Sequence, residues 1–459
     1  MTDGDDFPGG FLPFDLNALF SGGAGDPWAT ASQMAGAVAS GGNPEPNLDP
    51  LTRMDVEALA RVAELHVAQA PGVTLPATAT VVPVTKTEWT RRSVTAYRPF
   101  FERFGEALGS AVQAERDADP GDPLGMMLGQ MMTSLGPMLV AASAGSMIGH
   151  LGSTALGQYD LPVPRLTDDV LVVPSTIDAT AADWHVPVEE LRLWVLIHEL
   201  TTHAVLSTPH VRRRLESLLI DFAAAFRPNP DVIADQLSLG DGPPDLSRIQ
   251  ELSEQLNSPD AMLSMMRSPA HDLLVPQLNA LLAAILGFVD HTVGRISQGL
   301  VASQAAITEE FRSRWVEVAP ADRMMERLLG LDITQTMIDR GDAFITGVVE
   351  RAGDEGLVRL WADDLDLPTA AEVDAPGLWL TRIGLGEPED AFETDIPDDL
   401  SGLAELGGWG LDETADGDTP SGDHPSMGSS PGTANPDPGT PDPDTTNPDR
   451  TEPEDPGAD

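Results

Sequence analysis

Apolar residues recur at helical spacing through most of this chain, and that periodicity restricts the fold more than any other feature. In residues 51–68, Val56, Leu59 and Ala63 lie on one helical face, and Pro71 marks the stop. Short β-branched runs occur at 80–84 and 170–173. Similar periodicity predicts helices over 89–112, 186–206, 212–226, 278–301 and 321–350. We therefore expect a mainly α fold with minimal β structure.

The charge balance is strongly acidic. The chain has 73 acidic and 26 basic residues, giving a formal charge of −47, and Lys86 is its one lysine. Like charges repel, so nucleic acid and anionic membranes are not expected as partners. An acidic, lysine-poor surface stays hydrated in concentrated salt, where repulsion is screened within ~3 Å at 1 M. We interpret the chain as a halophilic protein, although its acidic tail contributes part of the charge.

The chain has no cysteine, which excludes disulfides and thiolate metal sites and leaves His, Asp and Glu as metal ligands. The first residues lack the basic start and apolar run of a signal peptide, so we expect a cytoplasmic protein. Composition predicts three parts: a flexible arm over 1–45, a helical domain over 46–386, and a disordered acidic Pro/Asp/Gly-rich tail over 387–459.

One long segment, between Asp122 and Asp160, carries no formal charge and is rich in Met and Gly. Its length raises the question of a membrane span. Against a span stand Gln130, Pro137, many glycines and the lack of a flanking Lys/Arg cluster. We expect a buried helical hairpin packed through small residues, with membrane association as the alternative.

The segment most informative about chemistry is 191–206, which reads LRLWVLIHELTTHAVL. In zincin peptidases, two His at i and i+4 hold zinc and the intervening Glu activates the metal-bound water. Here the spacing is HExxxH, which puts His198 and His203 about 140° apart on a regular helix. A π-bulge could absorb the extra residue. Alternatively, Glu199 and His203, at i and i+4, could hold a metal together, or the histidines could only form buried hydrogen bonds.

Several further segments occur in the same order as in a known family. They read PLGMMLGQMMTSLG, GQYDLPVP, VPVEELRLWVLIHELTTHAVL, HVRRRLESLL and ILGFVDHTV, and a longer block follows over 328–384. Over residues 50–384 the chain resembles the zincin-like zinc-dependent metalloproteases known mainly from actinobacteria and archaea, which are sometimes associated with coenzyme F420 biosynthesis. The resemblance implies a helical zincin-like domain, bound Zn²⁺ and peptidase activity.

Carried over to this sequence, the resemblance makes His198 and His203 metal ligands and Glu199 the general base. Family members often carry a Glu in the segment matching ILGFVDH, where this chain has Leu286. Asp290 lies one helical turn further on and is our expected third ligand. Its alternative role is a helix-surface or capping carboxylate, and the neighbouring His291 is a weaker candidate.

Two functions follow from these observations. The first is a zinc-dependent metallohydrolase that cleaves peptide bonds in a peptide or protein substrate through metal-activated water. The alternative is a catalytically degenerate zincin-like scaffold that acts as a binding or interaction protein, which the longer motif and Leu286 favour. The sequence leaves the oligomeric state open.

Overall fold

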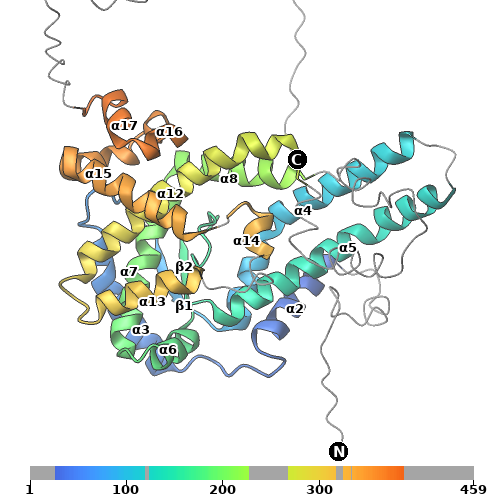
Figure 1. Cartoon of the computed structure of the whole chain (residues 1–459). Coiled ribbons are helices and arrows are strands. Elements are labelled where there is room, and N and C mark those ends of the chain that lie inside the picture. The colour runs from blue at the N-terminus through green and yellow to red at the C-terminus, as the bar shows by residue number, and fades with distance from the viewer. Residues whose placement is uncertain (1–25, 119–122, 227–266, 317–323, 332, 387–459) are drawn as a thin grey trace, which may run out of the picture. The chain divides into compact units, whose positions relative to one another are not determined.

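The structure is a computed structural model that describes residues 26–118, 123–226, 267–316, 324–331 and 333–386 (Figure 1). The described residues are mainly helical with one small sheet, which confirms the predicted fold class. The expected acidic tail, 387–459, and the first 25 residues of the expected arm lie outside the described residues.

The helices lie in the following order along the chain: α2 (Pro27–Ala39), α3 (Pro50–Val67), α4 (Lys86–Ala118), α5 (Pro123–Thr154), α6 (Pro174–Asp183), α7 (Val188–Ser207), α8 (Pro209–Ala224), α12 (Pro269–Ser297), α13 (Gln304–Val316), α14 (Met324–Leu328), α15 (Gln335–Leu360), α16 (Ala370–Asp374) and α17 (Pro376–Arg382), with a 3₁₀ turn η1 (Asp364–Asp366) before α16. Many begin with proline at the first turn, where its missing N–H costs no hydrogen bond. Asp26 and Asp49 cap α2 and α3 by accepting backbone hydrogen bonds.

The sheet consists of two parallel strands, β1 (Thr80–Pro83) and β2 (Asp169–Val172), at the predicted positions. Thr80 pairs with Asp169 and Pro83 with Val172. Pro83 is tolerated because both strands of a two-stranded sheet are edge strands. The pairing joins segments that are far apart in the sequence, and it places β2 and the residues before it beside α7.

Helix α7 is the central helix of the described domain, and every residue from Leu191 to Leu206 is buried. It packs against α3, α12, α6 and β2, which surround it (Figure 1). A helix covered on all sides is expected to be apolar around its whole circumference, as this one mostly is. The candidate motif therefore lies inside the core.

Helix α2 corrects one expectation, because residues 27–39 of the predicted flexible arm form a packed helix. Its buried Ala31 and Ala35 lie against α5, and glycines on α5 permit this close approach. A Cβ atom at Gly145 would lie 2.6 Å from the carbonyl oxygen of Ala31, and one at Gly149 would lie 2.6 Å from the Cβ of Val38. Small residues thus hold α2 in place.

The uncharged segment 122–160 also differs from its prediction. Its residues 123–154 form one helix, α5, which is followed by an isolated bridge at Gly157 and a turn, and the hairpin partner of α5 is α4 (Figure 1). In the described part of the chain, the one helix long and apolar enough to cross a membrane is α12, and 56% of its most apolar window is buried in the protein.

The predicted helix over 321–350 is wrong, because the chain breaks between α14 and α15. Gly330 adopts a φ of +72°, which ends α14. Thr334 then caps α15 by accepting a hydrogen bond from the N–H of Met337. Apolar periodicity on both sides of the break concealed these two signals.

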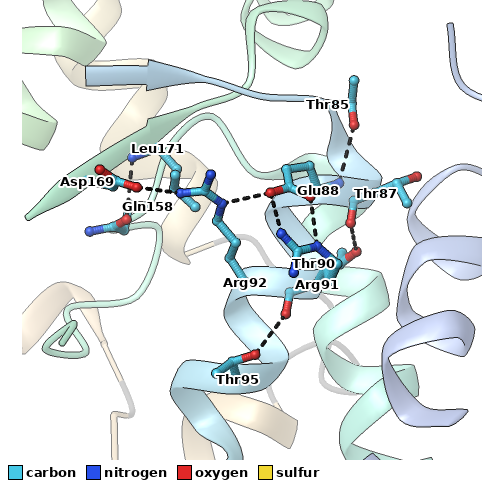
Figure 2. A network of polar contacts seen from close by, with 10 residues as sticks. All are labelled: Thr85, Thr87, Glu88, Thr90, Arg91, Arg92, Thr95, Gln158, Asp169 and Leu171. Atoms are coloured by element: carbon cyan, nitrogen blue, oxygen red, sulfur yellow. Dashed lines mark hydrogen bonds and ion pairs between the residues drawn. The ribbon is translucent and has the colours of Figure 1, made fainter. Parts of the chain in front are cut away.

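A polar network ties the start of α4 to β2 (Figure 2). Arg92 donates through Nη1 to Asp169 at 2.7 Å and through Nε to Glu88 at 2.8 Å. Arg91 also donates to Glu88, and the two guanidinium groups, Arg91 foremost, lower the pKa of Glu88 to about 2. On the far side of the network, the side chain of Gln158 accepts from the N–H of Leu171 at 3.4 Å. The network thereby orients β2 and the segment that precedes it.

Candidate functional site

The backbone of α7 is a regular α-helix from Val188 to Ser207, with no π-bulge at the motif. The hydroxyls of Thr201 and Thr202 bond to the carbonyl oxygens four residues earlier, at 2.7 Å and 2.8 Å. The extra residue is therefore not absorbed, and His198 and His203 leave the helix about 140° apart.

His198 lies among aromatic rings. Its imidazole stacks on Trp194 with a centroid separation of 5.5 Å and lies 4.8 Å from the ring centroid of Phe311. Its Nδ1 is 3.4 Å from Oε1 of Glu199, the one carboxylate beside it. These contacts are those of a core histidine.

Glu199 is enclosed, with 2% of its surface exposed. Its Oε2 accepts a hydrogen bond from the N–H of Tyr159 at 2.9 Å. Gly157 lies directly against the carboxyl group, since a Cβ there would be 2.3 Å from Cδ of Glu199. Burial raises the pKa of Glu199, and the hydrogen bond from His198 opposes that rise.

His203 contacts the side-chain hydroxyl of the same tyrosine, Tyr159. The hydroxyl of Tyr159 lies 2.7 Å from Nδ1 of His203. The Nε2 atom is buried and has no hydrogen-bond partner among the described residues, and Oδ1 of Asp168 is 3.9 Å from it. The other oxygen of Asp168 accepts from Thr78. Burial lowers the pKa of His203 and so favours a neutral imidazole.

Residues 155–168, here called the cover segment, supply most of these contacts, and residues 155–165 are all buried. Neighbouring elements fix the segment in place. Trp89 donates through Nε1 to the carbonyl of Gly157 at 2.7 Å, and Arg314 binds Asp160 at 2.7 Å. Gly157 also forms an antiparallel bridge with Val172 of β2. The cover segment is therefore part of the core and not a loose loop over it.

Arg165 and Glu199 are linked through one peptide group. Arg165 donates through Nη2 to the carbonyl oxygen of Gln158 at 3.1 Å, and the N–H of the same peptide group donates to Glu199. The guanidinium also lies over the ring of Tyr97, 4.6 Å from its centroid. A buried cation and a buried carboxylate thus polarise the peptide group between them.

The second buried arginine, Arg192, shows how the contacts of Arg165 differ from a direct ion pair. Of the two buried arginines in the described residues, Arg192 binds the carboxylate of Asp178 directly at 2.6 Å. Arg165 binds only neutral oxygens, those of Ser93, Tyr97 and Gln158, within the described part of the chain. Glu199 is therefore the carboxylate that Arg165 reaches through the peptide group.

Asp290 lies apart from this cluster. It forms an ion pair with Arg312 of α13, and its side chain is 25% exposed. Burial lowers the pKa of the neighbouring His291, and Leu286 packs against the core. Among the residues that the structure describes, no three His, Asp or Glu side chains converge to hold a metal ion.

These observations test whether the predicted donors fit zinc. A zinc site needs at least three protein ligands within about 2.0–2.2 Å of one point. His198 stacks on aromatic rings, Asp290 is paired with Arg312, and Tyr159 binds Oε2 of Glu199 and Nδ1 of His203, which leaves Nε2 of His203 as its one available donor atom. The set His198, His203 and Asp290 does not fit in this conformation. Two pairs of potential donors do lie close together, His203 with Asp168 and His198 with Glu199.

Sequence reasoning did not single out Tyr159, Arg165 or Asp168. The first two lie in or just after the GQYDLPVP segment, and all three are distant from α7 in the chain. One signal was available: Tyr159 is a polar residue at the end of the uncharged run, and Asp160 is the first charged residue after it. Their partners depend on the parallel pairing of β1 and β2, which periodicity does not reveal.

Comparison with known proteins agrees with this fold. Residues 27–380 match the family model described as zincin-like metallopeptidase, so the chain belongs to that family. A crystal structure from Chloroflexus aurantiacus, reported as a proposed hydrolase with a novel fold, is similar at a TM-score of 0.50 and 20% identity. The match covers 78% of this chain and 98% of that one, and it supports the fold alone. No curated protein matches the chain.

Proposed function

We propose that this zincin-like family member has kept the scaffold but does not hydrolyse peptides with a metal at α7, and that it acts as a binding protein. One observation carries the proposal: Glu199 is enclosed beneath a buried segment, and its Oε2 accepts a hydrogen bond from the backbone N–H of Tyr159. A general base must lie within hydrogen-bond reach of the water that it activates. Glu199 is instead engaged by a backbone N–H of its own chain.

Exposing Glu199 would require displacing the cover segment. Its hydrogen bonds to Trp89 and Arg314, and those of its own Arg165 to Ser93 and Tyr97, would have to break, and each buried hydrogen bond contributes about 1 kcal/mol. The apolar side chains of Leu156, Leu161 and Val163 would also become exposed. A substrate would have to offset that cost before any chemistry, which favours a permanent structural role for the segment.

One observation favours the second candidate, a zinc-dependent metallohydrolase acting on peptides or proteins. Nε2 of His203 is a buried, unbonded and neutral donor, and it faces a carboxylate. His203 and Asp168 could hold part of a Zn²⁺ site, with Glu199 as the base on the same helical face. Bound zinc would supply an acidified water. In that reading Asp168, and not Asp290, supplies the carboxylate.

Metal content separates the two candidates. We would purify the full chain in high salt, dialyse it against zinc and measure zinc per chain by elemental analysis, together with hydrolysis of a fluorogenic peptide library. The scaffold proposal predicts no retained zinc and no turnover. Near one zinc per chain that is lost in His203→Ala but kept in His210→Ala, with Glu199-dependent turnover, would establish the hydrolase instead.

The cellular setting belongs to the same proposal. The charge of −47 and the single lysine support a cytoplasm that accumulates salt, and they argue against nucleic-acid partners. Unfolding followed against potassium chloride concentration tests this. Stability that rises steadily into the molar range supports a halophilic protein, and stability unchanged by salt counts against it.

A further inference from the structure

A cavity lies away from α7, where the end of α3 meets α12 and α15, and it contains none of the motif residues. Its volume is about 180 Å³. The lining residues are His66, Gln69, Ala70, Pro71, Thr292, Arg295, Ile296 and Leu357. One water needs only ~10–15 Å³, whereas sites for drug-sized ligands begin near ~300 Å³. The cavity suits a small ligand or the end of a larger one.

The cavity is lined by both polar and apolar residues. His66, Gln69, Thr292 and Arg295 supply hydrogen-bonding groups, and Ile296 contributes aliphatic surface, whereas the side chain of Leu357 is buried in the core. No acidic side chain is among the described residues that line it, although acidic residues outnumber basic ones in the chain by 73 to 26. Donors with a guanidinium among them are suited to a carboxylate.

Arg295 is held in place at the cavity by a partner outside the lining. Its Nη1 binds Oδ1 of Asp354 at 2.6 Å, and its Nη2 lies 3.5 Å from Oδ2. Nε has no hydrogen bond among the described contacts. Asp354 orients the guanidinium and partly neutralises it, so a ligand carboxylate would bind beside an existing ion pair.

The walls are close-packed and preformed. Gly72, with φ +74°, approaches α15 so closely that a Cβ would lie 2.3 Å from the carbonyl oxygen of Leu357. Gly287 of α12 meets α15 in the same way, since a Cβ there would lie 2.2 Å from the carbonyl oxygen of Gly341. Three elements in backbone contact leave the cavity little freedom to collapse.

Exposed apolar residues lie next to the lining residues in the chain. Leu65 and Val62 on α3 are 58% and 40% exposed, and Val358 on α15 is 51% exposed. Val62 lies one helical turn before His66 and shares its face of α3, while Leu65 and Val358 are neighbours of lining residues in the chain only. A ligand with an aliphatic body would cover such surface while its charged end entered the cavity.

We propose that this cavity binds a carboxylate carried on a short aliphatic body, of the kind found at the C-terminal residue of a peptide ending in Leu or Val. This inference rests on the proposed binding function and names its ligand class. Arg295 and His66 would contact the carboxylate, and Ile296 would contact the aliphatic group.

The test is a calorimetric titration of the full chain with N-acetyl-leucine and with N-acetyl-leucinamide, which has the same shape but no charge. We expect the acid to bind at least about tenfold more tightly, as for a charge-assisted hydrogen bond. Arg295→Gln should remove that preference. Arg340→Gln, which alters an α15 arginine paired with Asp374 outside the cavity, should keep it.

Equal binding of acid and amide, no binding of either, or a preference that persists in Arg295→Gln would each overturn the proposal. Circular dichroism of both variants establishes that they are folded. A second variant, Ile296→Asn at the partly buried apolar lining residue, should weaken acid and amide alike, and unchanged affinity there would also count against the cavity. Zinc-dependent peptidase activity would refute the proposed function without changing this titration, so the two failures are distinguishable.

Discussion

Two polar clusters, one around Glu88 at the start of α4 and one around Glu199 on α7, differ in how their carboxylates are bound. At the start of α4, Glu88 binds two arginines directly and remains 32% exposed (Figure 2). On α7, Glu199 is 2% exposed and reaches a cation only through a peptide group. The pKa of Glu88 falls because of its arginines, whereas burial raises the pKa of Glu199. A buried carboxylate in a family motif can thus serve structure as well as chemistry.

The largest expected effect comes from a substitution that places a methyl group against the buried carboxyl group of Glu199. In Gly157→Ala the new methyl group would lie 2.3 Å from Cδ of Glu199, and neither the helix nor the bridged strand can move aside. We expect a loss of about 3 kcal/mol or more in the free energy of unfolding, measured by denaturant titration.

The control is Gly109→Ala on α4, where no atom lies within 4 Å of the added Cβ. It should be neutral or stabilise by up to about 1 kcal/mol. Similar stabilities for the two variants would mean that Glu199 and Gly157 are not in contact.

The next prediction concerns the energetic coupling between Arg165 and Glu199. In a double-mutant cycle of Arg165→Gln and Glu199→Gln, we expect a coupling of about 1–2 kcal/mol, because each group polarises the same peptide bond. Unfolding free energies of the four proteins give the coupling. Additive effects would show that Arg165 and Glu199 are not coupled through the peptide group between them.

A pH series sharpens the contrast with Glu88. Its folded pKa of about 2 lies below the ordinary value of 4.5, so its contribution to stability is present above pH 4.5 and is lost as pH falls towards 2. Glu88→Gln should cost on the order of 1 kcal/mol near neutral pH, and the difference from wild type should shrink through that window. A difference that stays constant down to pH 2 would contradict the assignment.

The smallest effect concerns Asp290, the metal ligand expected from sequence. Its pair with Arg312 is partly exposed, so Asp290→Asn should cost less than about 1 kcal/mol and leave the metal content unchanged. Zinc analysis of wild type and variant in parallel checks this. Loss of bound zinc in the variant would restore Asp290 as a ligand.

Sequence reasoning predicted the helical class, both strands and the position of α7, because apolar spacing reports local structure directly. It did not reveal α2 as a packed helix, since that helix depends on glycines of α5 over a hundred residues away. Of the candidate site, sequence reasoning identified only the residues on α7. Tyr159 and Arg165 act through contacts that the fold creates, and no spacing along the chain encodes them.

The most direct test of the central claim is a crystal structure grown with zinc, with an anomalous difference map recorded at the zinc absorption edge. We predict that no peak appears within bonding distance of His203 or Glu199, and that Tyr159 still binds both. A peak ligated by His203 together with His198, Glu199 or Asp168 would show that α7 holds a metal centre and would contradict the proposal.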